Sequence, residues 1–471
     1  MATIVLFTAI TACLVAVALR GGFVPARYMC WILIAEALVH LLKRAIFLIG
    51  PQSTAEYYSA QGILAGAIVV GCVLGLSRMS RIQAGVRQLI LFTVVGLLTT
   101  AFGGEPMGAK AASVVDFIFP ALVFPVALLI SPDKLGKIAK FYIALLALAV
   151  PYATYQFFAG PSFLDRAWAL GAGDSSTQAG FVLQALDGTL RDLFRPYAFY
   201  ADPLNFGLVA VASFGVIAAA AALGKLNRAT TVAGLTLSVI AALLTLGRSP
   251  SLGIISTLAI YQLLSYRFFR KPAVLLAIFV ATFLFVNVFS QYLSENYADL
   301  DYSQDNAVAS RFETIGTLTD RSHSLELFRE LLSPRNLLGR GYAYSRGSSS
   351  RGFDVEDTQL MGSHNIVIGI MLATGLPGAI LISLFLGSII RDGLAFAAMA
   401  GARAKAMKWL AASVLGHLIV GLISGHGVLD MHFYMIAGIL AGGGRFVAAS
   451  KRQAASDRHS VRELQQLAVG S

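Results

Sequence analysis

The sequence predicts an all-α protein: a polytopic transmembrane bundle of about 12–13 spans with a partly helical large periplasmic loop. Composition is the first reason, because apolar residues make up 57% of the chain and charged residues only 13%, about half the share in a soluble protein. The second reason is that the apolar residues form long continuous runs, and one helical span needs about 20 of them. These runs lack the alternation of membrane strands, which favours helices over a barrel.

Thirteen apolar runs are candidate spans, and two long polar segments divide them into three groups. Polar segments of that length on a rigid scaffold usually carry function. The predicted spans cover residues 2–19, 28–49, 60–77, 88–103, 112–130, 138–159, 203–223, 230–246, 251–266, 272–291, 364–389, 409–424 and 430–449. The predicted units are the N-terminal helices 1–159, the first periplasmic loop 160–202, the central helices 203–291, the large periplasmic loop 292–363, the C-terminal helices 364–449 and the cytoplasmic tail 450–471.

The charges of the connecting segments predict which side of the membrane each one meets. One alternate set of connectors, together with the C-terminal tail, holds 22 basic and 4 acidic residues. The positive-inside rule places this set in the cytoplasm and the two long loops on the outer side. The same asymmetry explains the net charge of +11, so the basic residues predict contacts with membrane lipids and no nucleic-acid partner.

The large loop contains one clear helical pattern, in the segment TDRSHSLELFRELLSP. Thr319 or Asp320 is a candidate cap, and a proline ends the pattern. Leu325, Phe328 and Leu332 form an apolar stripe at the spacing of one helix face. Arg321 lies on the same stripe, so we expect its side chain to point into the protein.

The segment Ser363-His364-Asn365 directly precedes a long apolar run. Ser363 is a plausible N-cap of the helix that follows, which places His364 and Asn365 in its first turn at the outer membrane face. A helix N-terminus attracts anions and disfavours an imidazolium, so a histidine there tends to stay neutral and can act as a base. The alternative is that His364 is a polar interface residue that merely ends the loop.

Two arginines stand at outer positions where the positive-inside bias predicts few cations. Arg195 begins RPYAFYADPLNFG at the end of the first long loop, and its aromatic residues are expected to form an interfacial belt. Arg248 lies in the short outer turn of LTLGRSPSLG, where it needs an anionic partner, solvent or a lipid headgroup.

Arg195, Arg248, Arg321 and His364 all project from one side of the membrane. Three arginines near one histidine suit a polyanion, most simply a pyrophosphate. The sequence offers no DxD, no paired loop carboxylates and no His/Cys metal spacing. We therefore predict that arginines rather than Mg²⁺ hold the diphosphate, with no bound metal and no cofactor.

Two further groups of ionisable residues lie in or beside the predicted spans. The first lies on one face of the second span and is either functional or a polar seam between helices. The second clusters at the outer end of the last pair of spans, but it offers too few ligands for a confident zinc assignment. The first group is Glu36, His40 and Arg44, and the second is His426, Asp430 and His432.

Four segments, taken in order, resemble the O-antigen ligase and O-antigen polymerase superfamily of bacterial envelope enzymes. They are RPYAFYADPLNFG, LTLGRSP, DRSHSLELFRELLSPRNLLGRGY and SHNIVIGIMLATGLPG, and they cover about residues 190–380. The last two segments are the most similar to the family, with a glycine-rich loop end followed by His-Asn at the entry to a Gly-Pro-Gly span. One departure is Pro250, which follows Ser249 where many relatives have a small residue.

The resemblance implies a metal-independent glycosyltransferase in the bacterial inner membrane, with its active site facing the periplasm. The donor would be a glycan on undecaprenyl pyrophosphate, and the acceptor a hydroxyl of a growing glycan or of lipid A-core. His364 would be the general base, with Asn365 beside it in the substrate site. Arg195, Arg248 and Arg321 would bind the leaving pyrophosphate. A chain-length regulator is an expected protein partner.

The resemblance leaves two acceptors open, and the composition leaves other classes of protein open. We favour a polymerase of repeat units over a ligase, although the acceptor pocket has no recognised sequence code. A transporter or lipid flippase would show inverted repeats and broken helices near the membrane midplane, and the sequence shows no such repeat. A purely structural subunit would leave the outer arginines and His364 unexplained.

Overall fold

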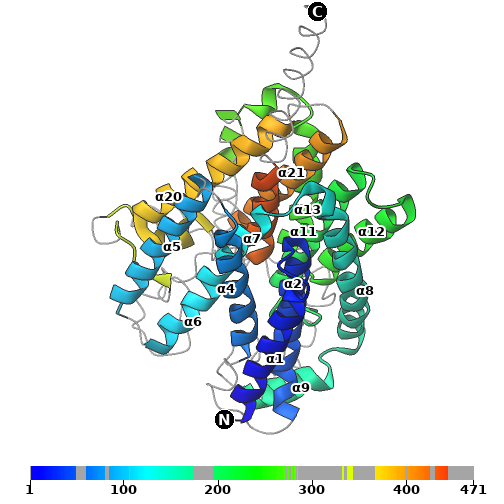
Figure 1. Cartoon of the computed structure of the whole chain (residues 1–471), viewed down its shortest axis with the longest axis vertical. Helices are drawn as coiled ribbons and strands as arrows, with labels where there is room; N and C mark the ends of the chain where they lie inside the picture. Colours follow the sequence, from blue (N-terminus) through cyan, green and yellow to red (C-terminus); the bar gives the residue numbers. More distant parts are fainter. Residues whose placement is uncertain are drawn as a thin grey trace, which may run out of the picture.

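The computed structural model is helical throughout the part of the chain that it describes, and no strand occurs there (Figure 1). The all-α class that the sequence predicts is therefore confirmed. The described residues are 2–48, 60–79, 84–104, 107–172, 182, 195–271, 273–274, 277–278, 280–282, 284, 331–333, 337–342, 366–397, 401–424 and 430–443.

The helices follow the apolar runs of the sequence closely. The N-terminal group comprises α1 (Ala2–Leu19), α2 (Pro25–Ala45), α4 (Gln61–Ser77), α5 (Ala84–Phe102), α6 (Met107–Ile118), α7 (Phe124–Leu128), α8 (Leu135–Ala159) and α9 (Phe163–Ala172). The central group comprises α11 (Pro203–Ala222), α12 (Arg228–Leu244) and α13 (Arg248–Leu263). The C-terminal group comprises α20 (Ile366–Ala397), α21 (Ala402–Ser424) and a last helix, Met431–Gly443.

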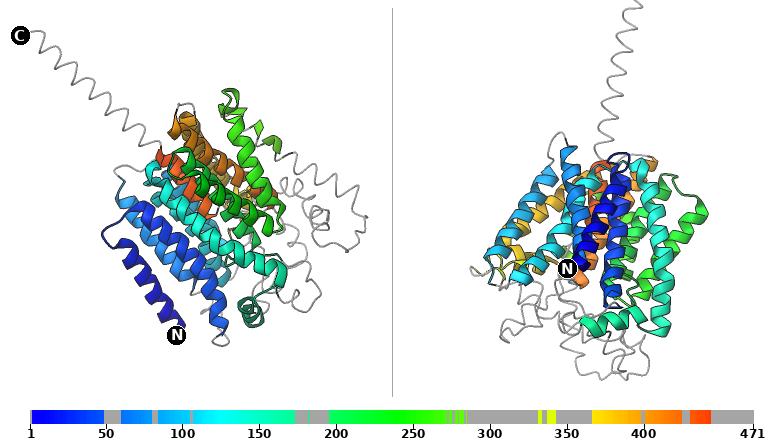
Figure 2. Two further views of the ribbon diagram at one scale, coloured as in Figure 1. Left: turned by 90° about the vertical axis from the view of Figure 1, so that its right-hand side faces the viewer. Right: turned by 60° about the horizontal axis from the view of Figure 1, so that its bottom comes forward.

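Five helices of the described chain are long and apolar enough to cross a membrane. Further apolar helices, among them Gln61–Ser77 and Arg228–Leu244, are shorter. Figure 2 shows the helices running alongside one another as a bundle, with α1 at its edge and α9 across one end. The protein is thus an all-α helical membrane protein. The five helices are Gly85–Phe102, Pro132–Ala159, Pro203–Ala222, Ile366–Ala395 and Ala402–Ile423.

Two expectations from the sequence differ from the structure. The apolar run 112–130 is not one helix but α6, a 3₁₀ segment and α7, because Pro120 and Pro125 lack the N–H that a continuous helix needs. In the large loop, Leu332 is 48% exposed, whereas its neighbour Leu331 is buried and packs against α20. The stripe that placed Leu332 on the buried face is therefore wrong at that residue.

The central helix of the bundle is α11, which lies between α8, α12, α13 and α21. In its apolar stretch 83% of the residues are buried inside the protein. Small residues allow this close packing, since a Cβ at Gly215 would lie 2.4 Å from Ser413 Oγ of α21. A rigid, buried α11 fixes the position of the segment that enters it.

Three charged residues near helix ends lie together at one end of the bundle. Asp133, before α8, forms exposed ion pairs with Lys225, before α12, at 4.0 Å and with Arg403 of α21 at 3.9 Å. All three residues belong to segments that the charge pattern assigns to one side. The end of α2 and the short helix α9 meet at the opposite end of the bundle (Figure 1).

Helix α20 is broken at Gly375, where the backbone adopts φ +65°. Residues 337–341 fill the break: the N–H groups of Arg340 and Gly341 donate to the carbonyls of Leu372 and Ala373, at 2.7 and 2.9 Å. In return the Leu376 N–H donates to the Leu337 carbonyl at 2.9 Å. The glycine-rich loop end of the sequence therefore has a structural role, because it satisfies the backbone groups that the break would leave unpaired.

The break in α20 predicts that two glycine-to-alanine substitutions in this helix differ in their effect on stability. Gly375→Ala forces a Cβ into a left-handed residue and to within 2.3 Å of the Leu337 carbonyl oxygen, which we expect to cost about 2 kcal/mol or more. Gly387→Ala meets no atom within 4 Å and replaces a helical glycine, so it leaves stability unchanged or raises it slightly. Thermal unfolding of the purified protein in detergent checks both; equal midpoints would contradict the role of Gly375.

Candidate anion-binding site

Arg195 and Arg248 stand before or at the N-termini of two neighbouring helices. Asp202 caps α11, since its Oδ1 accepts a hydrogen bond from the Asn205 N–H at 2.8 Å. Helix α13 begins at Arg248 itself. The two starts are held together because Pro250 packs on Gly207, where a Cβ would lie 2.2 Å from the proline Cγ. Pro250, which stands where many members of the family that the sequence resembles have a small residue, therefore serves in packing α13 against α11.

The electrostatics of this corner favour a bound anion. Desolvation by the surrounding protein lowers the pKa of Arg195. The like charge of nearby Arg248 lowers it further. Among the described residues no carboxylate forms an ion pair with Arg195. The N-terminus of α13, which begins at Arg248, adds its partial positive charge to those of the guanidinium groups. An anion in this corner would relieve the mutual repulsion, and a diphosphate suits two guanidinium groups best.

The backbone that carries Arg195 is held by Gln156, a buried residue of α8. Gln156 Oε1 accepts hydrogen bonds from the N–H groups of Tyr197 and Ala198, at 3.1 and 2.8 Å. Ala198 has φ +50°, an unusual conformation for a residue with a Cβ. Such a conformation persists only where neighbouring groups impose it. Gln156 therefore fixes the turn that leads out of Arg195.

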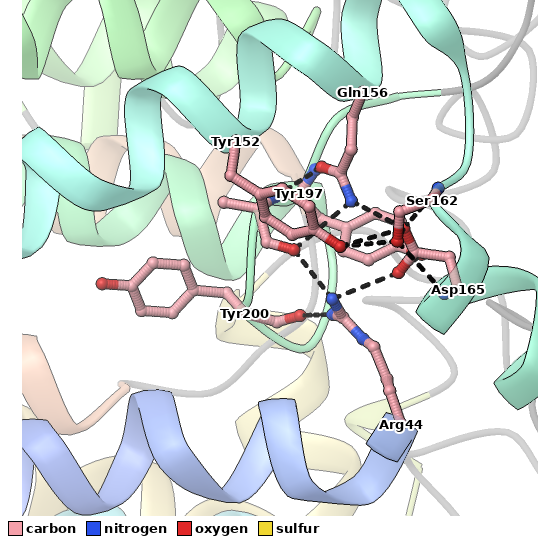
Figure 3. Close-up of polar contacts among 8 residues, drawn as sticks. Arg44, Tyr152, Gln156, Ser162, Asp165, Tyr197 and Tyr200 are labelled. Carbon is pink, nitrogen blue, oxygen red and sulfur yellow. Dashed lines mark hydrogen bonds and ion pairs between the residues drawn. The ribbon is translucent and has the colours of Figure 1, made fainter. Parts of the chain in front are cut away.

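Arg44, at the end of α2, holds the same turn from the other side (Figure 3). Its Nη1 donates to the Ala198 carbonyl at 2.7 Å, and its Nη2 donates to the Tyr200 carbonyl. The guanidinium also lies 4.3 Å from the centroid of the Tyr197 ring and forms an ion pair with Asp165 at 3.3 Å. Arg44 is 2% exposed and Asp165 is fully buried, so the pair is shielded from water and salt.

Asp165 closes the network from α9, as Figure 3 shows. Its Oδ1 accepts from the Tyr197 hydroxyl at 2.9 Å, and burial raises the pKa of Tyr197 well above its ordinary value, which keeps that hydroxyl a donor. Its Oδ2 accepts from Ser162 Oγ at 2.7 Å and from Gln156 Nε2 at 3.0 Å. Tyr152 completes the set, with its hydroxyl 2.6 Å from Ser162 Oγ. We call Arg44, Tyr152, Gln156, Ser162, Asp165 and Tyr197 the buried clamp.

The structure describes only some of the residues that the sequence singled out for the site. Arg195 and Arg248 are near enough to influence each other electrostatically, whereas Arg321, His364 and Asn365 lie outside the described residues. The expected aromatic belt is wrong for Tyr197 and Tyr200, which are almost fully buried in the protein rather than at a lipid interface.

The two ionisable groups noted in the spans meet different partners. The polar residues on one face of α2 have separate partners. Arg44 contacts Asp165, whereas Glu36 contacts His432. His432 is thereby joined to a residue nearly 400 positions earlier in the chain. His426 lies outside the described residues.

Sequence reasoning missed Asp165, Gln156 and the helix α9 that carries Asp165. One signal was available, since Ser162 and Asp165 have the S-x-x-D spacing of a capping box. In the structure Ser162 Oγ accepts from the Asp165 N–H at 3.3 Å and the Ser162 N–H donates back to Asp165 at 2.9 Å. Nothing in the sequence pairs Gln156 with the turn after Arg195.

Comparison with known proteins adds no relative to this picture. No protein-family model matches the chain, and no curated protein matches it significantly. The class of the protein, a helical membrane protein, therefore rests on its own sequence and structure.

The buried clamp predicts a large effect for a small substitution. Asp165→Asn keeps the side-chain size but leaves Arg44 as a buried cation without its counter-charge, which we expect to cost about 3 kcal/mol. Asp133→Asn removes an exposed carboxylate from pairs of 3.9 and 4.0 Å and should change stability by less than about 0.5 kcal/mol. Thermal unfolding in detergent compares the two variants. A loss in Asp165→Asn no greater than in Asp133→Asn would show that the clamp does not stabilise the fold.

Proposed function

We propose that this protein is a glycosyltransferase of the bacterial inner membrane, acting on the periplasmic side. It transfers a glycan from undecaprenyl pyrophosphate to the hydroxyl of an acceptor, and a polymerase of O-antigen or exopolysaccharide repeat units is the favoured form. The observation that carries the proposal is the pair Arg195, in the segment that leads into α11, and Arg248, at the start of the neighbouring helix α13. The four family-like sequence segments add independent support.

The arginine pair suits the leaving group of this reaction. When the acceptor oxygen bonds to the anomeric carbon, the bond from that carbon to the diphosphate oxygen breaks. The lipid diphosphate then carries an additional negative charge, which fixed guanidinium groups and helix N-termini stabilise without needing to reorganise. Arginine also offers the planar donors that bind two phosphate oxygens at once. The membrane bundle lets the polyprenyl tail stay in lipid.

The acceptor hydroxyl must lose its proton in the same reaction. We assign this proton to His364, which the sequence places in the first turn of an outer helix end. Arg321 and Asn365 would complete the substrate site, the first on the diphosphate and the second beside the base. These three assignments rest on the sequence alone.

Two acceptors remain as forms of the same proposal. A polymerase passes the growing glycan to a new lipid-linked repeat unit and works with a chain-length regulator. A ligase passes a finished glycan to lipid A-core or to another acceptor. Both forms require the diphosphate corner, so the intermediate that accumulates in an inactive variant distinguishes them.

A transporter is the candidate from a different class, and the broken helix α20 favours it. Broken helices in transporters expose backbone groups that bind substrates or ions. In this chain the carbonyls of Leu372 and Ala373 are already bonded to residues 340–341. Because these backbone groups face protein, the break supports a fixed loop more than a transport site.

The test is complementation of a deletion strain with variants, followed by gel analysis of the surface polysaccharide and a blot for the protein. We expect Arg195→Ala and Arg248→Ala to lower polymer at least about 10-fold, because each removes charge-assisted hydrogen bonds. His364→Ala should abolish it. Accumulated lipid-linked single repeats would identify a polymerase, and lipid-linked long chains a ligase.

The matched control for the arginine variants is Arg228→Ala. Arg228 is an exposed arginine at the start of α12, beyond the turn that holds Lys225 at the opposite end of the bundle. It should leave polymer unchanged. Normal polymer in both Arg195→Ala and Arg248→Ala, with normal protein level, would refute the proposed function.

A further inference from the structure

A second buried polar cluster joins three helices that are distant in sequence. Glu36 of α2 and His432 of the last helix form an ion pair, with 3.0 Å between Oε2 and Nε2. The other ring nitrogen of His432, Nδ1, lies 2.7 Å from the Tyr142 hydroxyl of α8. The His432 side chain is 2% exposed, and that of Glu36 keeps 14% exposure. Carboxylate, imidazole and phenol therefore form a continuous series of close polar contacts inside the bundle.

Further polar atoms face this series without a hydrogen-bond partner of their own. They are the Tyr200 hydroxyl, Asp430 Oδ2 and His417 Nε2, all buried. The other nitrogen of His417 lies 2.8 Å from the Ser413 carbonyl, and the other oxygen of Asp430 accepts from the Phe433 N–H at 2.7 Å. Buried polar atoms of native proteins are almost always paired, so ordered water is the usual partner of such groups.

Tyr200 joins the cluster to the turn that follows Arg195. The Tyr200 carbonyl accepts a hydrogen bond from Arg44, while the Tyr200 hydroxyl points away from the buried clamp (Figure 3). Burial raises the pKa of the Tyr200 hydroxyl, and the nearby Glu36 carboxylate raises it further. The hydroxyl therefore stays protonated and can donate toward the cluster.

The cluster holds two carboxyl groups but, in the described part of the chain, no lysine or arginine that pairs with them. Glu36 and Asp430 are two carboxyl groups, and among the described residues neither forms an ion pair with a lysine or arginine. A buried carboxylate without a counter-charge is costly in the interior of a membrane protein. The titratable groups around the pair are Cys30, Tyr142, Tyr200, His417, Asp430 and Tyr434.

We propose that Glu36 and His432 form a buried proton-binding site, which internal water extends to His417, Asp430 and Tyr200. One proton is shared across the Glu36–His432 contact at neutral pH, and the Tyr142 hydroxyl accepts the hydrogen bond of the second ring nitrogen. The bound proton keeps the pair neutral overall. The site is separate from the arginine corner and does not require the proposed transferase activity.

The test is nitrogen NMR of the full-length protein in lipid nanodiscs, with ¹⁵N-labelled histidine. The chain has seven histidines, and His432→Gln identifies the resonances of His432 by their loss. We expect a ring that is protonated on both nitrogens at pH 7.5, where an ordinary histidine, of pKa about 6.5, is mostly neutral. Glu36→Gln should remove that protonation, whereas Arg228→Ala should leave it unchanged.

A second measurement keeps the test valid if a single variant unfolds. The double variant Glu36→Gln/His432→Gln replaces the pair by two neutral amides that can still hydrogen-bond. We expect its thermal midpoint to vary less with pH between 6 and 9 than that of the wild type, in which deprotonation leaves a buried carboxylate. A His432 ring that is neutral at pH 7.5, or an equal pH dependence in the double variant, would overturn the proposal.

Discussion

The buried ion pair between Arg44 and Asp165 is the interaction on which the end of the bundle around α9 depends. It joins the end of α2 to α9, and through the carbonyls of Ala198 and Tyr200 it fixes the turn that carries Arg195. A buried pair of this kind stabilises a fold only when its remaining hydrogen-bonding groups are satisfied. Here the aspartate accepts from several donors, so loss of either charge would loosen the turn as well as the helices.

The same constraint, that backbone groups must be paired inside a membrane protein, explains the break in α20. Gly375 leaves helical geometry, and residues 337–341 supply the missing hydrogen bonds. The segment 337–341 needs glycine twice, since Gly339 and Gly341 both have positive φ and a Cβ at Gly339 would lie 2.4 Å from the Gly375 nitrogen. The large loop is thereby attached to the helix that begins directly after His364.

Tyr200 connects two polar regions of different character. On one side, the buried clamp contains the full charges of Arg44 and Asp165, which neutralise each other. On the other side, the carboxyl groups near Tyr200 face histidines, whose charge depends on protonation. The Tyr200 ring also stacks on Phe206, with 5.6 Å between centroids, so the segment between the two regions packs against the start of α11. The proposed anion site and proton site are thus neighbours that share one segment.

The sequence by itself determined the helical membrane class and most helix positions, because apolar runs of span length have few other solutions in a bilayer. Its charge pattern also singled out Arg195 and Arg248. Only the tertiary structure brings these two arginines within electrostatic reach of each other, with the contact between Gly207 and Pro250 joining the starts of α11 and α13. It alone paired Arg44 with Asp165 and Glu36 with His432, because side chains more than a hundred residues apart are matched by helix packing and not by any local pattern.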